Sequence, residues 1–104
     1  MNNIFWRGYC NNERIIAIND IQKIIGDYGY ITDFKQFSDI SISIKIELEE
    51  QNIDKLFCAL KSYMSLDDFE SLNSFSNRES LVFLNLTFIK ETGDLEIEIP
   101  AVPG

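Results

Sequence analysis

The sequence contains no histidine. Histidine is the usual general acid or base near neutral pH and the commonest metal ligand, so its absence excludes histidine-based catalysis and histidine-ligated metal centres. A cysteine nucleophile would have to be activated by a lysine or a carboxylate. No D-x-D-x-D-G calcium loop is present, so the acidic clusters at residues 47–54 and 67–70 are interpreted as solvated charge. We therefore expect no catalytic residues, no metal, no cofactor and no enzyme activity.

Basic residues are also scarce. The 104-residue chain has 9 Lys and Arg against 17 Asp and Glu, which gives a formal net charge of −8. Nucleic-acid binding and adsorption to anionic membranes both depend on clustered basic side chains, and the sequence has no basic run. We expect neither nucleic acid nor membrane as a partner. The charge has two readings, which are solubility and steering toward a positively charged surface of another protein.

Long apolar runs are missing too. No stretch approaches the roughly 18 apolar residues of a membrane-spanning helix, and the first residues lack the basic and apolar regions of a signal peptide. The only cysteines, Cys10 and Cys58, have no metal-ligand spacing. These features predict a cytoplasmic protein with two free thiols.

The clearest pattern that is present is a strict alternation of aliphatic and polar residues at 40–49. A period of two marks a half-buried strand of an antiparallel sheet, because a strand covered on both faces would be apolar throughout. Residues 4–10, 30–37 and 80–90 are further predicted strands, the second pairing with 40–49 as a hairpin. Residues 91–94 are predicted to turn into an acidic edge strand at 95–99.

Two segments have helical periodicity instead. The first follows Asn11 or Asn12 as cap, and Gly29 is predicted to end it in a left-handed conformation. The second follows Asn52 as cap, and Cys58 points away from its apolar side. A further short helical turn is predicted at 65–72. The predicted apolar stripes are Ile15, Ile18, Ile21, Ile25 and Tyr28 in the first helix, and Ile53, Leu56, Phe57, Leu60, Tyr63 and Met64 in the second.

The resulting order predicts one α+β domain over residues 1–104. It is a two-layer sandwich of ferredoxin-like β-α-β-β-α-β topology with an extra C-terminal edge strand, an antiparallel sheet and both helices on one face. The predicted core consists of Ile18, Ile21, Ile25, Ile42, Ile44, Ile46, Leu56, Phe57, Leu60, Leu84, Leu86 and Ile97.

A function has to be sought on the sheet face that the helices leave open. RNA-binding domains of this topology stack bases on aromatic side chains of that face, but the strand at 40–49 offers serine, lysine and glutamate there. Aromatic residues elsewhere on the face would form an apolar patch that needs a cover, which is the segment 100–104, a second copy of the chain or another protein, with the last two favoured. The first strand presents to this face either Phe5, Arg7 and Tyr9 or Ile4, Trp6 and Gly8. The predicted partner-binding residues are Phe5, Arg7, Tyr9, Glu47, Glu49, Phe83, Glu96 and Glu98.

Three functions remain open. The first is a small acidic protein-interaction module without catalytic activity. It would bind a protein partner, and the acidic charge of the chain favours a basic one, as in inhibitor or immunity proteins that bind cationic nucleases. Alternatively, it would self-associate as a dimer through the open face. The second is a small-molecule-sensing regulatory domain of ferredoxin-like topology, with its site at the turn of residues 9–12. The third is an enzyme that uses carboxylates, for which the residues offer no further support.

Overall fold

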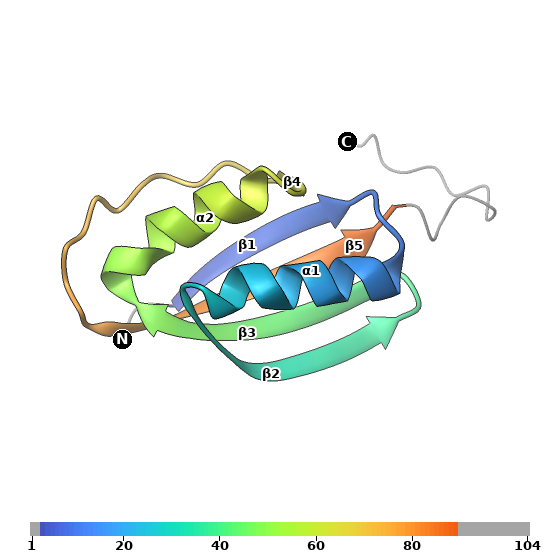
Figure 1. Cartoon of the computed structure of the whole chain (residues 1–104), viewed down its shortest axis with the longest axis horizontal. Coiled ribbons are helices and arrows are strands. Elements are labelled where there is room, and N and C mark those ends of the chain that lie inside the picture. Colours follow the sequence, from blue (N-terminus) through green and yellow to red (C-terminus); the bar gives the residue numbers. More distant parts are fainter. Residues whose placement is uncertain (1–2, 90–104) are drawn as a thin grey trace.

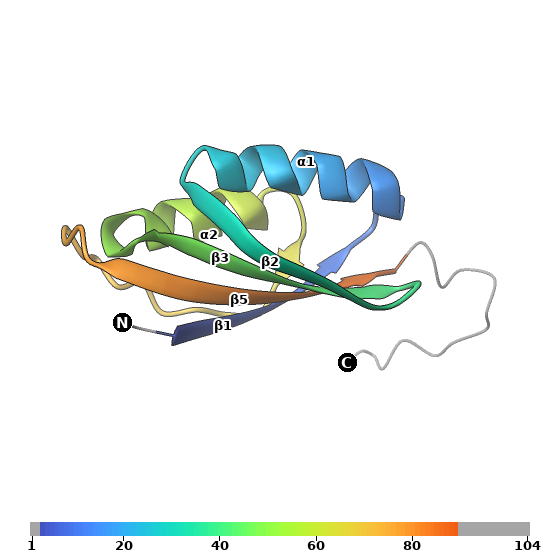
Figure 2. The same ribbon diagram turned by 90° about the horizontal axis from the view of Figure 1, so that it is seen from below.

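The computed structural model describes residues 3–89 as a five-stranded sheet with two α-helices on one face (Figures 1 and 2). This α+β arrangement of two layers agrees with the sequence prediction. The predicted turn at 91–94 and strand at 95–99 lie outside the described residues. The elements in chain order are β1 Asn3–Cys10, α1 Arg14–Gly26, β2 Gly29–Ser38, β3 Ser41–Glu49, a 3-10 turn Glu50–Asn52, α2 Ile53–Lys61, β4 Ser65–Leu66 and β5 Glu79–Phe88.

The strand order, β2-β3-β5-β1-β4, differs from the ferredoxin-like order. In that order the first strand separates the third from the last, whereas here β5 lies between β3 and β1. β5 pairs antiparallel with β3 but parallel with β1, so the sheet is mixed and the prediction of an antiparallel sheet is wrong at this pairing. Both edges of β5 are occupied, and it has no free edge for a hairpin partner.

The segment 67–78 explains the direction of β5. A helix that follows a strand returns the chain to the end where that strand began, and the next strand then runs parallel to it. Here residues 67–78 travel back along α2 after β4, so β5 starts at the end where β3 stops (Figure 1). The Asp54 carboxylate holds this segment by accepting hydrogen bonds from the backbone N–H groups of Leu72, at 2.9 Å, and Asn73, at 2.8 Å.

The helical turn predicted at 65–72 is wrong. Ser65 and Leu66 form the short strand β4, which pairs antiparallel with Tyr9 and Gly8 of β1, and residues 67–72 have no regular secondary structure. Phe69, one of the residues that suggested a helical period, packs against the core from this irregular segment. Apolar residues that recur every three positions were therefore not sufficient evidence for a helix.

The period of two in β3 is confirmed. Ile42, Ile44, Ile46 and Leu48 are buried against the helices, and the polar residues between them lie half-buried on the other face. The phase of α2 is also confirmed: Ile53, Leu56, Phe57 and Leu60 are buried, whereas Cys58 is exposed.

The stripe of α1 is confirmed at Ile21 and Ile25, which are buried, while Ile18 is half-buried against the core. The prediction is wrong at Ile15, which is 71% exposed. Isoleucine occupies so many positions of this helix that several apolar stripes can be drawn on it. The small side chain of Ala17, fully buried, is part of the face that meets the core.

The predicted cap of the first helix is wrong, because Glu13 rather than Asn11 or Asn12 precedes α1, without a side-chain capping bond. Asn52 does occupy the N-cap position of α2, but its side-chain amide donates a 3.3 Å hydrogen bond to the Tyr28 carbonyl and makes no capping bond to the helix. Gly29 does not end α1 in a left-handed turn. The helix ends at Gly26, and Gly29 begins β2.

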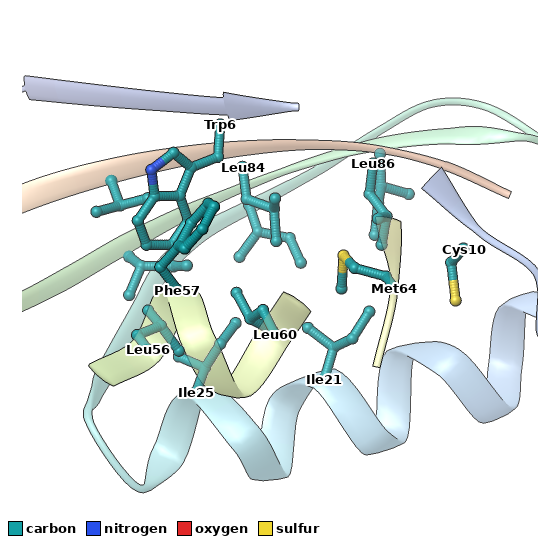
Figure 3. Close-up of a cluster of buried hydrophobic side chains, with 14 of the residues drawn as sticks. Trp6, Cys10, Ile21, Ile25, Leu56, Phe57, Leu60, Met64, Leu84 and Leu86 are labelled. Atoms are coloured by element: carbon teal, nitrogen blue, oxygen red, sulfur yellow. The ribbon is translucent and has the colours of Figure 1, made fainter. Parts of the chain in front are cut away.

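The core lies between the sheet and the two helices (Figure 3). Every predicted core residue that is described is buried, apart from the half-buried Ile18, and Ile97 lies outside the described residues. The structure adds Trp6, whose indole makes edge contacts with Phe57 at 5.2 Å and Phe69 at 5.3 Å between ring centroids. Trp6 of β1 thereby packs against both α2 and the segment 67–78.

Candidate interaction surface

The sheet face opposite the helices, here called the open face, carries side chains in rows set by strand register. One row runs from Phe5 on β1 through Phe83 on β5 and Lys45 on β3 to Asp33 on β2. None of the described helices lies on this face (Figure 2). The next row holds Arg7, Asn85, Ser43 and Lys35.

The centre of the open face is an aromatic pair. The rings of Phe5 and Phe83 stack with centroids 5.0 Å apart and an interplanar angle of 15°, and Phe5 remains 71% exposed. The Lys45 ammonium group lies 5.9 Å from the Phe83 centroid, within the range of a cation–π contact. Stacking reduces the exposed area of the two rings, but most of Phe5 remains in water as apolar surface.

An acidic cluster lies at one end of the open face. Glu79 on β5 is directly opposite Glu49 on β3, and Glu47 is the next residue of β3 on the same face. Partial desolvation raises the pKa of the Glu79 carboxyl, and a hydrogen bond to Glu47 and the charges of Glu47 and Glu49 raise it further. Like charges opposite one another destabilise a strand pair. A cationic group placed against this end of the face would reduce the repulsion between the carboxylates.

The structure brings together most of the predicted partner-binding residues. Phe5, Arg7 and Tyr9 of β1, Phe83 of β5, and Glu47 and Glu49 of β3 all lie on the open face, with Phe5 and Arg7 exposed and the others half-buried. Glu96 and Glu98 lie outside the described residues. The placement of the six described residues on one face follows from the strand register. The role of these residues in binding stays a prediction.

Two prominent residues of this face were missed by the sequence analysis. The predicted strand at 80–90 excludes Glu79, although this residue continues the alternation of Leu81 and Phe83 and could have been placed on their face from the period of two. Tyr30, 72% exposed opposite Glu47, had no such signal, because the register of β2 shifts after Ile31.

A second concave region lies at the far end of β1. It is an open hollow of about 490 Å³ lined by Tyr9, Asn11, Ile89 and residues 61–65, and it adjoins the turn that the sequence analysis considered as a ligand site. On its border the Tyr63 hydroxyl donates a 2.7 Å hydrogen bond to Asp20 Oδ2. Burial, together with this hydrogen bond, raises the pKa of Tyr63 from its ordinary value of 10.0 to about 12.

The described residues contain no cluster of three or more histidine, cysteine or acidic side chains able to hold a metal ion. No helix within residues 3–89 is long and apolar enough to cross a membrane. No protein-family model matches the chain, and comparisons with curated proteins and with solved structures found no match.

Proposed function

We propose that the protein is an interaction module of the cytoplasm that binds a basic protein partner through the open face. The observation that carries this proposal is the stacked pair of Phe5 and Phe83 on a sheet face that no helix within residues 3–89 covers, with Phe5 71% exposed. Binding hot spots are typically aromatic residues at the centre of a surface that a partner desolvates. The aromatic pair supplies such an anchor.

The charge of the chain supports a basic partner. The protein has a net charge of −8, and Glu47, Glu49 and Glu79 crowd one end of the open face. Lysine or arginine side chains of a partner would relieve the repulsion between these carboxylates and would be attracted over a distance. Arg7, Lys35 and Lys45 give the rest of the face a mixed charge, so the attraction is directed to the acidic end.

The experiment uses the full chain as bait in a lysate of its native host, followed by titration of the purified partner. Phe5→Ala removes the anchor, and Ile15→Ala, at a side chain of equal 71% exposure on α1, is the matched control. We expect Phe5→Ala to weaken binding about tenfold or more and Ile15→Ala to leave it unchanged. The association rate should fall as salt rises, and more weakly so for Glu47→Gln.

Several outcomes would contradict the proposal. They are recovery of no partner, recovery of an RNA instead of a protein, a partner without excess positive charge, and binding that is indifferent to Phe5→Ala. An RNA that required Phe5 would reassign the aromatic pair as a base-stacking platform.

A second candidate, the small-molecule-sensing domain, is favoured by the hollow of about 490 Å³ beside the β1–α1 turn. Asn11, Lys61 and Ser62 provide polar groups there, as a ligand site needs for orientation. Thermal-shift measurements with the standard amino acids test it: a ligand that stabilises the protein but not its Asn11→Ala variant supports this function, and no stabilisation by any of them rejects it.

A further inference from the structure

The strand β2 forms one outer edge of the sheet and is unusually exposed. All seven residues 32–38 are exposed to solvent, including Phe34 at 37% and Phe37 at 67%. Among residues 3–89 its only strand partner is β3, so its other edge has no neighbour (Figure 1). A long edge strand with exposed aromatic residues is a template for pairing with another strand.

The charges of β2 are arranged so that the strand is complementary to itself. Asp33 and Lys35 are opposite Lys45 and Ser43 of β3 and therefore lie on the open face, whereas Phe34 is opposite the buried Ile44 and lies on the helix face. In an antiparallel pair of two β2 strands centred on Phe34, Asp33 of each copy is opposite Lys35 of the other. Directly opposite residues in such a pair share a face, so two ion pairs form on one side and the two Phe34 rings meet on the other.

We propose that β2 is a homodimer interface in which two copies of the chain pair antiparallel about Phe34. A dimer of this kind has twofold symmetry and uses the same patch on both copies. It extends the sheet through both copies and keeps their open faces on one side, so it is separate from the proposed binding of a basic partner.

The same charges select one register. The smallest displacement that keeps every side chain on its own face is two residues, since a displacement of one exchanges the faces. Displacement by two in one direction places Asp33 opposite Asp33, and in the other it places Lys35 opposite Lys35. Neither side chain has a hydrogen-bond or ion-pair partner within the described part of the chain. Charges that serve only to protect an edge need no such alternation of sign.

The test is sedimentation equilibrium of the full chain from micromolar to millimolar concentration. We expect a dimer for the wild type. Asp33→Lys and Lys35→Asp each convert both ion pairs into repulsive contacts and should each weaken dimerisation about tenfold or more. The double variant, with the two residues exchanged, restores both pairs and should dimerise like the wild type.

The two single variants separate local pairing from net charge. Asp33→Lys makes the net charge less negative and Lys35→Asp makes it more negative, so an effect of overall repulsion would move their dimerisation in opposite directions. Phe5→Ala, on the open face, should dimerise normally. A monomeric wild type at all concentrations overturns the proposal, as does a double variant that stays dissociated. Loss of the dimer in Phe5→Ala would place the contact on the open face instead. Circular dichroism of each variant checks the fold.

Discussion

Replacing Gly29 by alanine should destabilise the protein because the start of β2 runs unusually close to β3. A Cβ atom at this position would lie 2.5 Å from the Glu47 carbonyl oxygen and 2.6 Å from Leu48 Cβ. Both neighbours belong to the paired strand β3, whose register is fixed by the side chains that it buries against the helices. A flexible side-chain end could move aside, but this carbonyl group cannot do so without disturbing the sheet.

The size of the effect follows from two opposing contributions. Forcing a methyl group into a filled space costs about 1–3 kcal/mol. Alanine also restricts the unfolded chain more than glycine does, which returns about 0.4–1 kcal/mol. We expect a net loss of about 1 kcal/mol, within limits of about 0 and 2.6 kcal/mol, in the free energy of unfolding, with a fall in Tm of roughly 4–8 °C per kcal/mol for a domain of this size.

Gly26 is the matched control, since a Cβ there meets no atom within 4 Å and the residue belongs to α1. Gly26→Ala should stabilise the protein by up to about 1 kcal/mol. Urea unfolding followed by circular dichroism measures both variants. Gly29→Asn should also destabilise, whereas asparagine would be tolerated if Gly29 were a left-handed helix cap. A Gly29→Ala variant as stable as Gly26→Ala would refute the close approach.

Three further predictions concern stability. Ile44→Ala empties a fully buried site at the centre of the sheet and should cost about 2–5 kcal/mol in urea unfolding. The raised pKa of Glu79 means that the folded state binds its proton more tightly than the unfolded state, so this carboxyl favours folding at low pH and opposes it as pH rises above the ordinary value of 4.5. Glu79→Gln should therefore stabilise the protein at pH 7 and not at pH 4. An equal effect at both pH values would contradict the repulsion between Glu79 and the other carboxylates of the acidic cluster. Because Cys10 is buried and Cys58 exposed, both as free thiols, dithiothreitol should leave the unfolding curve unchanged; a shift would reveal a bond between them.

The elements with a single strong period could be predicted from the sequence. The alternation in β3 and the stripe of α2 each allow one phase, and the buried residues match it. The isoleucine-rich α1 allows several phases, so its exposed Ile15 could not be recognised. The same reasoning placed Phe83 on the open face but could not decide whether Phe5 or Trp6 of the first strand lies there, and the stacking of Phe5 on Phe83 depends on β1 and β5 being neighbours.

Strand order could not be predicted, because it depends on the course of residues 67–78. The spacing of apolar residues at its start predicted a helical turn that does not form, and the segment is held by hydrogen bonds to Asp54 and by the packing of Phe69 near Trp6. These are long-range contacts of individual side chains, and local propensity does not encode them. The self-complementarity of Asp33, Phe34 and Lys35 likewise became visible only when β2 was known to be an edge.

The central position of β5 has a consequence for how the chain folds. β1 is synthesised before the other elements of the sheet, but its main neighbour in the sheet is completed only at Phe88. Until then β3 also lacks a neighbour on one side, and the nascent chain presents two unpaired inner edges. Pairing across such a sequence distance closes a large loop late and slows folding. During that interval the growing polypeptide would be most exposed to aggregation and most dependent on chaperones.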